Sequence, residues 1–162
     1  MTIYRLKRGR KMKKIISLFL LTVMALGSVL FTSKSETLAA PAPILQSAKI
    51  DQVSNIDERW ENINSNTQPI YKAKAVMSDY VYFRVTTNGY STNLIYSGST
   101  AITKYATNYR STPITAGSIV TGWNKYYKVP VNELVENSIQ VYAISQVGTT
   151  KIWTNKITFD VE

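Results

Sequence analysis

The segment YVYFRVTT, residues 80–87, alternates apolar and polar side chains with a period of two. Tyr80, Tyr82 and Arg84 fall on one side of such a chain, opposite Val81, Phe83 and Val85. This alternation is typical of a β-strand that buries one face. The segment therefore predicts a strand with its valines and phenylalanine in a core and its tyrosines and arginine outside.

Period-two alternation recurs at residues 126–131, 138–145 and 151–161. It predicts that the following side chains face inward: Tyr127, Val129, Val131, Ile139, Val141, Ala143, Trp153, Ile157, Phe159 and Val161. Asn88-Gly89 predicts a hairpin to a strand at 90–97, since both residues tolerate positive φ; Gly148 marks another turn. Strands at intervals of roughly 8–12 residues predict an all-β fold, which we expect to be an antiparallel β-sandwich of about seven strands over residues 70–162.

Residues 129–161, VPVNELVENSIQVYAISQVGTTKIWTNKITFDV, resemble the last strands of immunoglobulin-like sandwiches. Leu134 precedes a turn, Val141 and Ala143 end a strand, and a glycine hairpin leads to a closing strand. The cysteine pair of true immunoglobulins is absent. The whole layout also resembles short secreted β-domain proteins of Gram-positive bacteria. That resemblance implies an extracellular location and supplies no functional residues.

A lead-in at residues 40–69 contains KIDQVSNIDERWENI, residues 49–63. Its apolar residues are spaced by three or four positions: Ile50, Val53, Ile56, Trp60 and Ile63. This is helical periodicity, and it predicts one short amphipathic helix. An edge strand or disorder is the alternative interpretation.

Residues 1–39 have the organisation of a secretory signal peptide. A basic stretch ends at Lys14, an apolar run covers residues 15–31, and small residues lead to a cleavage site after Ala39. An uncleaved membrane anchor is the alternative, because the apolar run approaches the length of a bilayer span. Translation from Met12 would shorten the basic stretch. After cleavage we expect a secreted protein with no stable membrane insertion.

Charge and composition exclude several functions. The chain carries 19 lysines and arginines against 10 acidic residues, but residues 1–39 hold eight of these cations and one anion. The remainder is nearly neutral, which together with export argues against nucleic acid as a partner. The absence of cysteine and histidine excludes thiol nucleophiles, histidine-dependent triads and zinc bound by either residue. We therefore expect no cofactor, no metal and no catalytic residue; the oligomeric state stays open.

A tyrosine-rich cationic segment is the candidate binding region. Residues 80–132 contain no acidic residue, five cations and eight tyrosines. Tyrosine and tryptophan combine a flat apolar ring with a polar tip, which suits sugar rings and protein interfaces. The candidate ligand-binding residues are Tyr80, Tyr82, Arg84, Trp123, Tyr126 and Lys128. The expected partner is a cell-wall polymer, a glycan or a host protein; the alternative is a tyrosine-rich sheet without a ligand, since tyrosine and threonine favour strands.

Two other functions remain open at this stage. A small polysaccharide hydrolase would need two carboxylates about 5–10 Å apart, and nine acidic residues are available after residue 39. A secreted inhibitor or antagonist would use a tyrosine-rich loop at residues 98–117. Calcium binding around residues 55–66 is a weaker alternative, because no spaced Asp/Asn loop with a central glycine occurs there.

Overall fold

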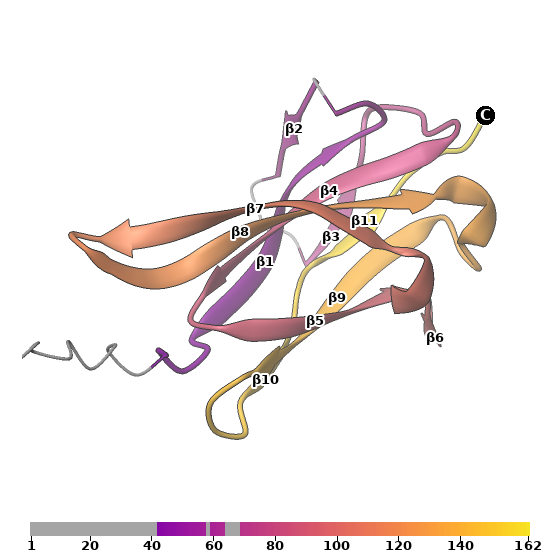
Figure 1. The fold of residues 1–162 in the computed structure, drawn as a ribbon. Helices are drawn as coiled ribbons and strands as arrows, with labels where there is room; N and C mark the ends of the chain where they lie inside the picture. Colours follow the sequence, from indigo (N-terminus) through magenta and orange to yellow (C-terminus); the bar gives the residue numbers. More distant parts are fainter. Residues whose placement is uncertain (1–41, 58, 64–68) are drawn as a thin grey trace, which may run out of the picture. The chain divides into compact units, whose positions relative to one another are not determined.

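A computed structural model describes residues 42–57, 59–63 and 69–162, and two β-sheets make up this part of the protein (Figure 1). These residues belong to a unit that spans Ala40–Glu162. The predicted signal peptide at residues 1–39, its predicted cleavage site at Ala39 and the alternative start at Met12 lie outside the described residues. None of the helices in the described part has the length and apolarity needed to cross a bilayer.

The first sheet has the strand order β2-β1-β4-β8-β7, and all of its pairs are antiparallel. Its strands are β1 (Ser47–Ser54), β2 (Glu61–Asn62), β4 (Tyr80–Asn88), β7 (Thr107–Ala116) and β8 (Ile119–Pro130). The long β7–β8 hairpin extends past the other strands (Figure 1).

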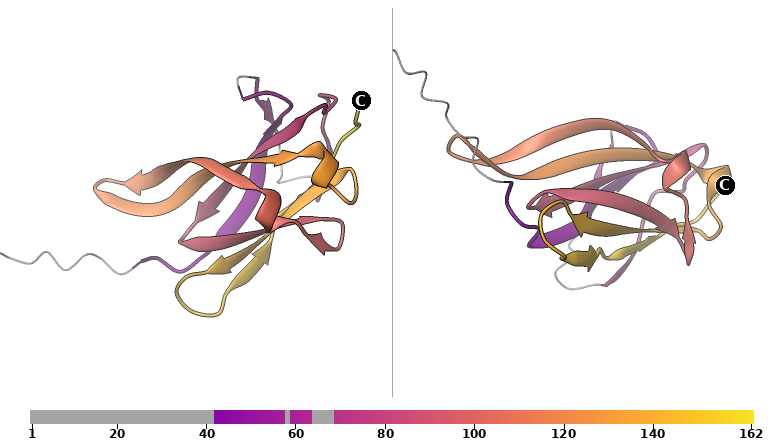
Figure 2. Two further views of the ribbon diagram at one scale, coloured as in Figure 1. Left: turned by 45° about the vertical axis from the view of Figure 1, so that its right-hand side comes forward. Right: turned by 60° about the horizontal axis from the view of Figure 1, so that its bottom comes forward.

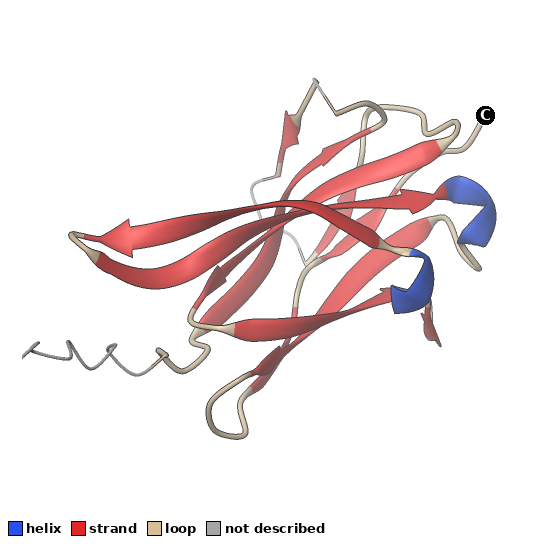
Figure 3. Ribbon diagram, in the orientation of Figure 1, coloured by secondary structure: helices blue, strands red, loops and turns tan. Residues whose placement is uncertain are grey.

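The second sheet has the order β3-β11-β9-β5-β6, with β10 also paired to β9. Its strands are β3 (Ile70–Lys72), β5 (Ser91–Ser97), β6 (Thr100–Ala101), β9 (Ser138–Ser145), β10 (Lys151–Trp153) and β11 (Lys156–Thr158). Only the β3–β11 pair is parallel. Two single-turn 3₁₀ helices, η1 (Thr103–Tyr105) and η2 (Val131–Glu133), complete the described elements (Figure 3).

The core lies between the two sheets, which appear as two layers in the right-hand view of Figure 2. Phe83 of β4 stacks on Tyr127 of β8 at its centre, with ring centroids 5.4 Å apart. The all-β sandwich is confirmed, as are the inward positions predicted for Val81, Phe83, Val85, Tyr127, Val129, Ile139, Val141, Ala143, Ile157 and Phe159. The described residues form eleven strands rather than about seven, because several are only two or three residues long.

The predicted helix at residues 49–63 is wrong, because strand β1 occupies the first part of this segment. Ile50 and Val53 are both fully buried although they are three residues apart. A β-bulge at Asp51 inserts an extra residue between Ile50 and Gln52, so the inward side of the strand changes parity there. The bulge thus produces a helix-like spacing, and the sandwich begins at Ser47 rather than at Ile70.

The predicted hairpin at Asn88-Gly89 is also wrong, because β4 and β5 lie in different sheets. Only Gly89 of the two has a positive φ, +97°, so the turn cannot be the primed type that joins paired strands. Gly89 donates its N–H to Thr121 O (2.7 Å), and Tyr90 donates to Pro43 O (3.0 Å). The turn therefore connects one sheet to the other, and residues 43–46 pack against it.

Trp153 does not share the buried face of Ile157 and Phe159, and half of its surface is exposed. Trp153 lies opposite Tyr142 of β9, whereas Ile157 lies opposite Ile139. The chain therefore has one more residue between Trp153 and Ile157 than β9 has between their partners. The extra residue falls at Thr154–Asn155 and reverses which side chains point inward. Asn155 then bridges the sheets, since its side-chain amide binds both the N–H (2.9 Å) and the C=O (3.0 Å) of Ile50.

The segment predicted as a loop at residues 98–117 is mostly regular structure. It contains β6, η1 and the whole of β7, which pairs with β8 along its length. The turn predicted at Gly148 is confirmed: Gly148 has a φ of +80° and connects β9 to its antiparallel neighbour β10.

Candidate functional site

Five of the six predicted binding residues lie on the outward side of the first sheet. β4 and β8 pair so that Tyr82 lies opposite Lys128 and Arg84 opposite Tyr126, while Tyr80 lies opposite Pro130. Directly opposed residues of an antiparallel pair share one face. The alternation that buries Val81, Phe83 and Val85 therefore places these five side chains together on the opposite side.

Their aromatic rings belong to a longer row. Ring centroids are 6.1 Å apart between Tyr80 and Tyr82, 6.1 Å between Tyr82 and Tyr109, and 6.3 Å between Tyr109 and Tyr126. Trp60 continues the row and meets Tyr126 edge to face at 5.6 Å. We call these five residues, Trp60, Tyr80, Tyr82, Tyr109 and Tyr126, the tyrosine face. It crosses strands β4, β8 and β7.

Three cations lie among these rings. The Arg110 guanidinium lies 3.7 Å from the centroid of the Tyr126 ring, and that of Arg84 lies 5.9 Å from the same ring. The Lys128 ammonium lies 5.4 Å from the centroid of Tyr80. A cation within about 6 Å of a ring centroid is attracted by the negative ring face. The tyrosine face therefore presents positive charge close to its ring faces.

Arg84 differs from the other two cations because Asp51 neutralises it. Its Nε donates to Asp51 Oδ1 (2.8 Å) and its Nη2 to Oδ2 (2.7 Å), a bidentate pair with 23 % and 14 % of the side chains exposed. The Thr86 hydroxyl donates to the same carboxylate (2.7 Å). The hydrogen bonds from Arg84 raise its pKa further above the ordinary value. Its charge is thus satisfied within the sheet, leaving Arg110 and Lys128 as the cations of the face.

Tyr109 is held in place by Asp57, whose carboxylate accepts a hydrogen bond from the tyrosine hydroxyl. Burial, and then this hydrogen bond, raise the pKa of Tyr109. Tyr109 and Arg110 are neighbours in sequence, yet both reach Tyr126. The ladder between β7 and β8 shifts by one residue between Asn108 and Arg110, and this bulge lets consecutive side chains lie on one face.

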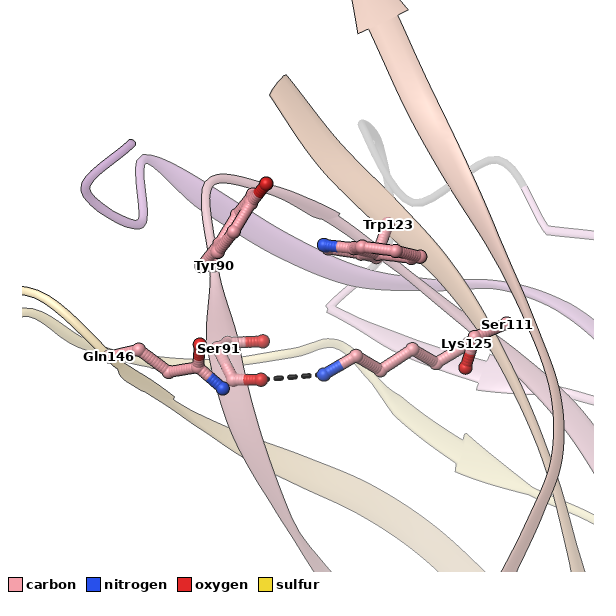
Figure 4. A pocket seen from close by; sticks show the side chains of 6 residues that line it. All are labelled: Tyr90, Ser91, Ser111, Trp123, Lys125 and Gln146. Carbon is pink, nitrogen blue, oxygen red and sulfur yellow. Dashed lines mark hydrogen bonds between the residues drawn. The ribbon is translucent and has the colours of Figure 1, made fainter. Parts of the chain in front are cut away.

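Trp123 is separated from the other five predicted residues. It lies opposite Thr87, a buried residue, and so belongs to the inward side of β8. There it lines a pocket with Tyr90, Ser91, Ser111, Lys125 and Gln146 (Figure 4). The predicted set therefore divides between two locations on the two sides of one sheet.

Five carboxylates of the described residues are engaged one by one at separate places. Asp51 binds Arg84, Asp57 accepts from Tyr109, Glu61 accepts from Tyr71 and the Lys74 N–H, Glu136 pairs with Lys156, and Asp160 pairs with Lys72. Within the described ranges no group of three or more acidic residues could hold a metal ion. The calcium alternative at residues 55–66 falls partly outside the described residues.

Sequence reasoning did not select Trp60, Tyr109, Arg110, Asp51 or Asp57. Tyr109 and Arg110 belong to the acid-free, tyrosine-rich segment, so composition carried a signal for them. Their position on one face depends on a bulge, which strict alternation does not predict. Trp60 falls in the segment predicted as a helix, and its contact with Tyr126 follows only from the folded chain.

One protein-family model matches the chain. It is described as a domain of unknown function, DUF4879, and it matches residues 40–159. No curated protein and no solved structure matches the chain.

Proposed function

We propose that this chain, which belongs to the DUF4879 family, is a secreted, non-catalytic module that binds an acidic glycan of a cell envelope or host through its tyrosine face. We also assign its two sheets to the immunoglobulin-like class, on the likeness of residues 129–161. Secretion and kinship with proteins of Gram-positive bacteria belong to the same proposal and are supported by the sequence of residues 1–39.

The observation that carries the proposal is the continuous row of five aromatic rings, four of them on β4, β7 and β8, with the cationic groups of Arg110 and Lys128 close to ring faces. Sugar rings have apolar C–H faces and polar edges, so they match amphipathic side chains such as tyrosine and tryptophan. Because the strands fix their positions, little side-chain freedom is lost when a ligand binds. A row of rings favours an extended ligand over a single small molecule.

The cations beside the tyrosine face indicate whether an acidic or a neutral glycan fits it better. Arg84 is neutralised by Asp51, whereas Arg110 and Lys128 lie over rings at which a bound sugar would stack. A carboxylate or sulfate on that sugar would meet one of these cations. Since both cations are near the surface, their contribution should weaken as salt increases. The face therefore fits an acidic glycan better than a neutral one.

Affinity electrophoresis through gels that contain polygalacturonate tests the proposal, with dextran as the neutral polymer. Polygalacturonate should retard the purified protein, and added salt should reduce the retardation. The Tyr82→Ala and Lys128→Gln variants should each bind about tenfold more weakly, as expected for loss of an aromatic or charged contact. Tyr96→Ala and Lys151→Gln make the same changes on the second sheet and should leave the retardation unchanged.

Equal retardation of wild type and a Tyr82→Ala, Lys128→Gln double variant would show that the tyrosine face is not the binding surface. The melting temperature of each variant separates lost binding from lost folding. Tyr82 and Lys128 are only half-buried on the outward side, so both variants should stay folded.

A further inference from the structure

The pocket that contains Trp123 is a second site, separate from the tyrosine face. It encloses about 300 Å³ and is lined by Tyr90, Ser91, Ser111, Trp123, Lys125 and Gln146. These residues come from the end of the β4–β5 turn and the first residue of β5, from the middle of β7 and β8, and from the turn after β9. The pocket therefore opens between the β7–β8 hairpin and the edge of the second sheet, and it is about large enough for one small ring.

Lys125 is the charged group of this pocket. Its Nζ donates to the backbone oxygen of Ser91 (2.6 Å), as the dashed line in Figure 4 shows. An ammonium group has three donors, so this contact leaves two for a ligand. None of the six lining residues is acidic. Burial of the side chain disfavours its charge and lowers its pKa. An anionic acceptor in the pocket would compensate that unfavourable burial.

The walls supply both apolar and polar contacts. The rings of Tyr90 and Trp123 meet edge to face with centroids 6.2 Å apart. Figure 4 shows the indole nitrogen of Trp123 on the side toward Tyr90, while the Ser111 and Gln146 side chains lie beside Lys125 and Ser91. A ligand here would meet two aromatic surfaces and several hydrogen-bonding groups next to one cation. A purely apolar ring would leave those polar groups unpaired.

We propose that this pocket binds a carboxylate-bearing sugar residue, such as a uronic acid, with its carboxylate on Lys125 and its ring against Trp123 and Tyr90. The carboxylate accepts the two remaining Lys125 protons, and the sugar hydroxyls bind Ser111 and Gln146. No bond is made or broken. The site uses none of the tyrosine-face residues. A uronate polymer carries groups for both surfaces, so the Lys125 variant tests the pocket and the Tyr82 and Lys128 variants test the tyrosine face.

Titration calorimetry of the purified protein with sodium D-glucuronate tests the site, with D-glucose and sodium acetate as separate ligands. Glucuronate should bind saturably, and glucose and acetate should each bind about tenfold more weakly or not at all. Lys125→Met keeps most of the apolar stem of the side chain and removes its charge. It should weaken glucuronate binding about tenfold or more, the factor expected for a hydrogen bond to a charged group. Lys151→Met, at an exposed position of β10 outside both sites, should leave that affinity unchanged.

A second measurement does not depend on any variant. In proton–nitrogen NMR spectra the indole signal of Trp123 should shift during the glucuronate titration, while those of Trp60 and Trp153 stay in place. Saturable binding that shifts only Trp123 and is lost in Lys125→Met supports the site. The proposal is overturned by absence of saturable glucuronate binding, by equal binding of acetate or glucose, or by equal effects of Lys125→Met and Lys151→Met.

Discussion

Single residues on the outward side of the first sheet have different roles, and Arg84, which lies beside the tyrosine face, illustrates the difference. Its outward position on β4 follows from the alternation of residues 80–87, as does that of Tyr82. The bidentate contact with Asp51 makes Arg84 a bridge between β4 and β1. A residue that fixes two strands together contributes to stability whether or not a ligand is present.

Asp51→Asn should therefore destabilise the protein by about 2 kcal/mol, because it leaves a largely buried guanidinium without its counter-charge. The double variant Asp51→Asn, Arg84→Gln removes both charges and should recover most of that loss. Urea unfolding followed by tryptophan fluorescence measures the three free energies of unfolding.

The pair between Lys72 and Asp160 provides the matched control. Its atoms are 3.0 Å apart, but 67 % and 64 % of the two side chains are exposed. An exposed pair contributes little, so Asp160→Asn should cost about 0.5 kcal/mol or less. If Asp51→Asn costs no more than Asp160→Asn, the structural role assigned to Arg84 is wrong.

At the scale of strands, local sequence patterns predicted which side chains face inward where strand pairing is regular. They failed where an extra residue interrupts the pairing. The inward side chains of β4, β8 and β9 follow from simple alternation. An extra residue reverses the alternation at Asp51 and again at Thr154–Asn155. The first reversal gives the apolar residues of β1 a helix-like spacing, and the second places Trp153 on the exposed side. A bulge is decided by the partner strand, so one segment read alone does not reveal it.

Turns show the same limit, and Gly89 gives a test. It combines a φ of +97° with a close approach: a Cβ there would lie 2.3 Å from the backbone oxygen of Ile44. Gly89→Ala should cost more than 2 kcal/mol, roughly the sum of backbone strain and a steric clash with main chain. Thermal unfolding with calorimetry gives the comparison between variants.

Gly148→Ala is the matched control for that substitution. Gly148 has a φ of +80°, but a Cβ would meet nothing within 4 Å. Only the strain of a positive φ applies, so the cost should be about 1 kcal/mol. Equal losses in the two variants would mean that residues 43–46 do not pack against the sheet-to-sheet turn as the structure shows.

For the whole molecule, the sequence predicted the two-layer β-architecture and the tyrosine-rich composition of the tyrosine face, but not how strands are shared between sheets. The dipeptide Asn88-Gly89 was compatible with a hairpin between the strands that flank it. In the folded protein residues 43–46 pack against this turn, and the two strands lie in different sheets. The pocket was likewise unpredictable, since its lining residues come from four separate segments. Long-range contacts of this kind leave no local periodicity in a sequence.

The last prediction concerns export of the whole protein. Residues 1–39 carry eight of the 19 cations and the long apolar run, so their removal converts a strongly basic chain into a nearly neutral one. Expression in a Gram-positive host should release into the medium a species whose intact mass corresponds to residues 40–162. Ala39→Glu places a charge where signal cleavage needs a small residue and should reduce that species sharply. Recovery from the medium of chains that retain residues 15–31 would contradict the assignment of a cleaved leader, and with it the proposal that the tyrosine face meets its glycan outside the cell.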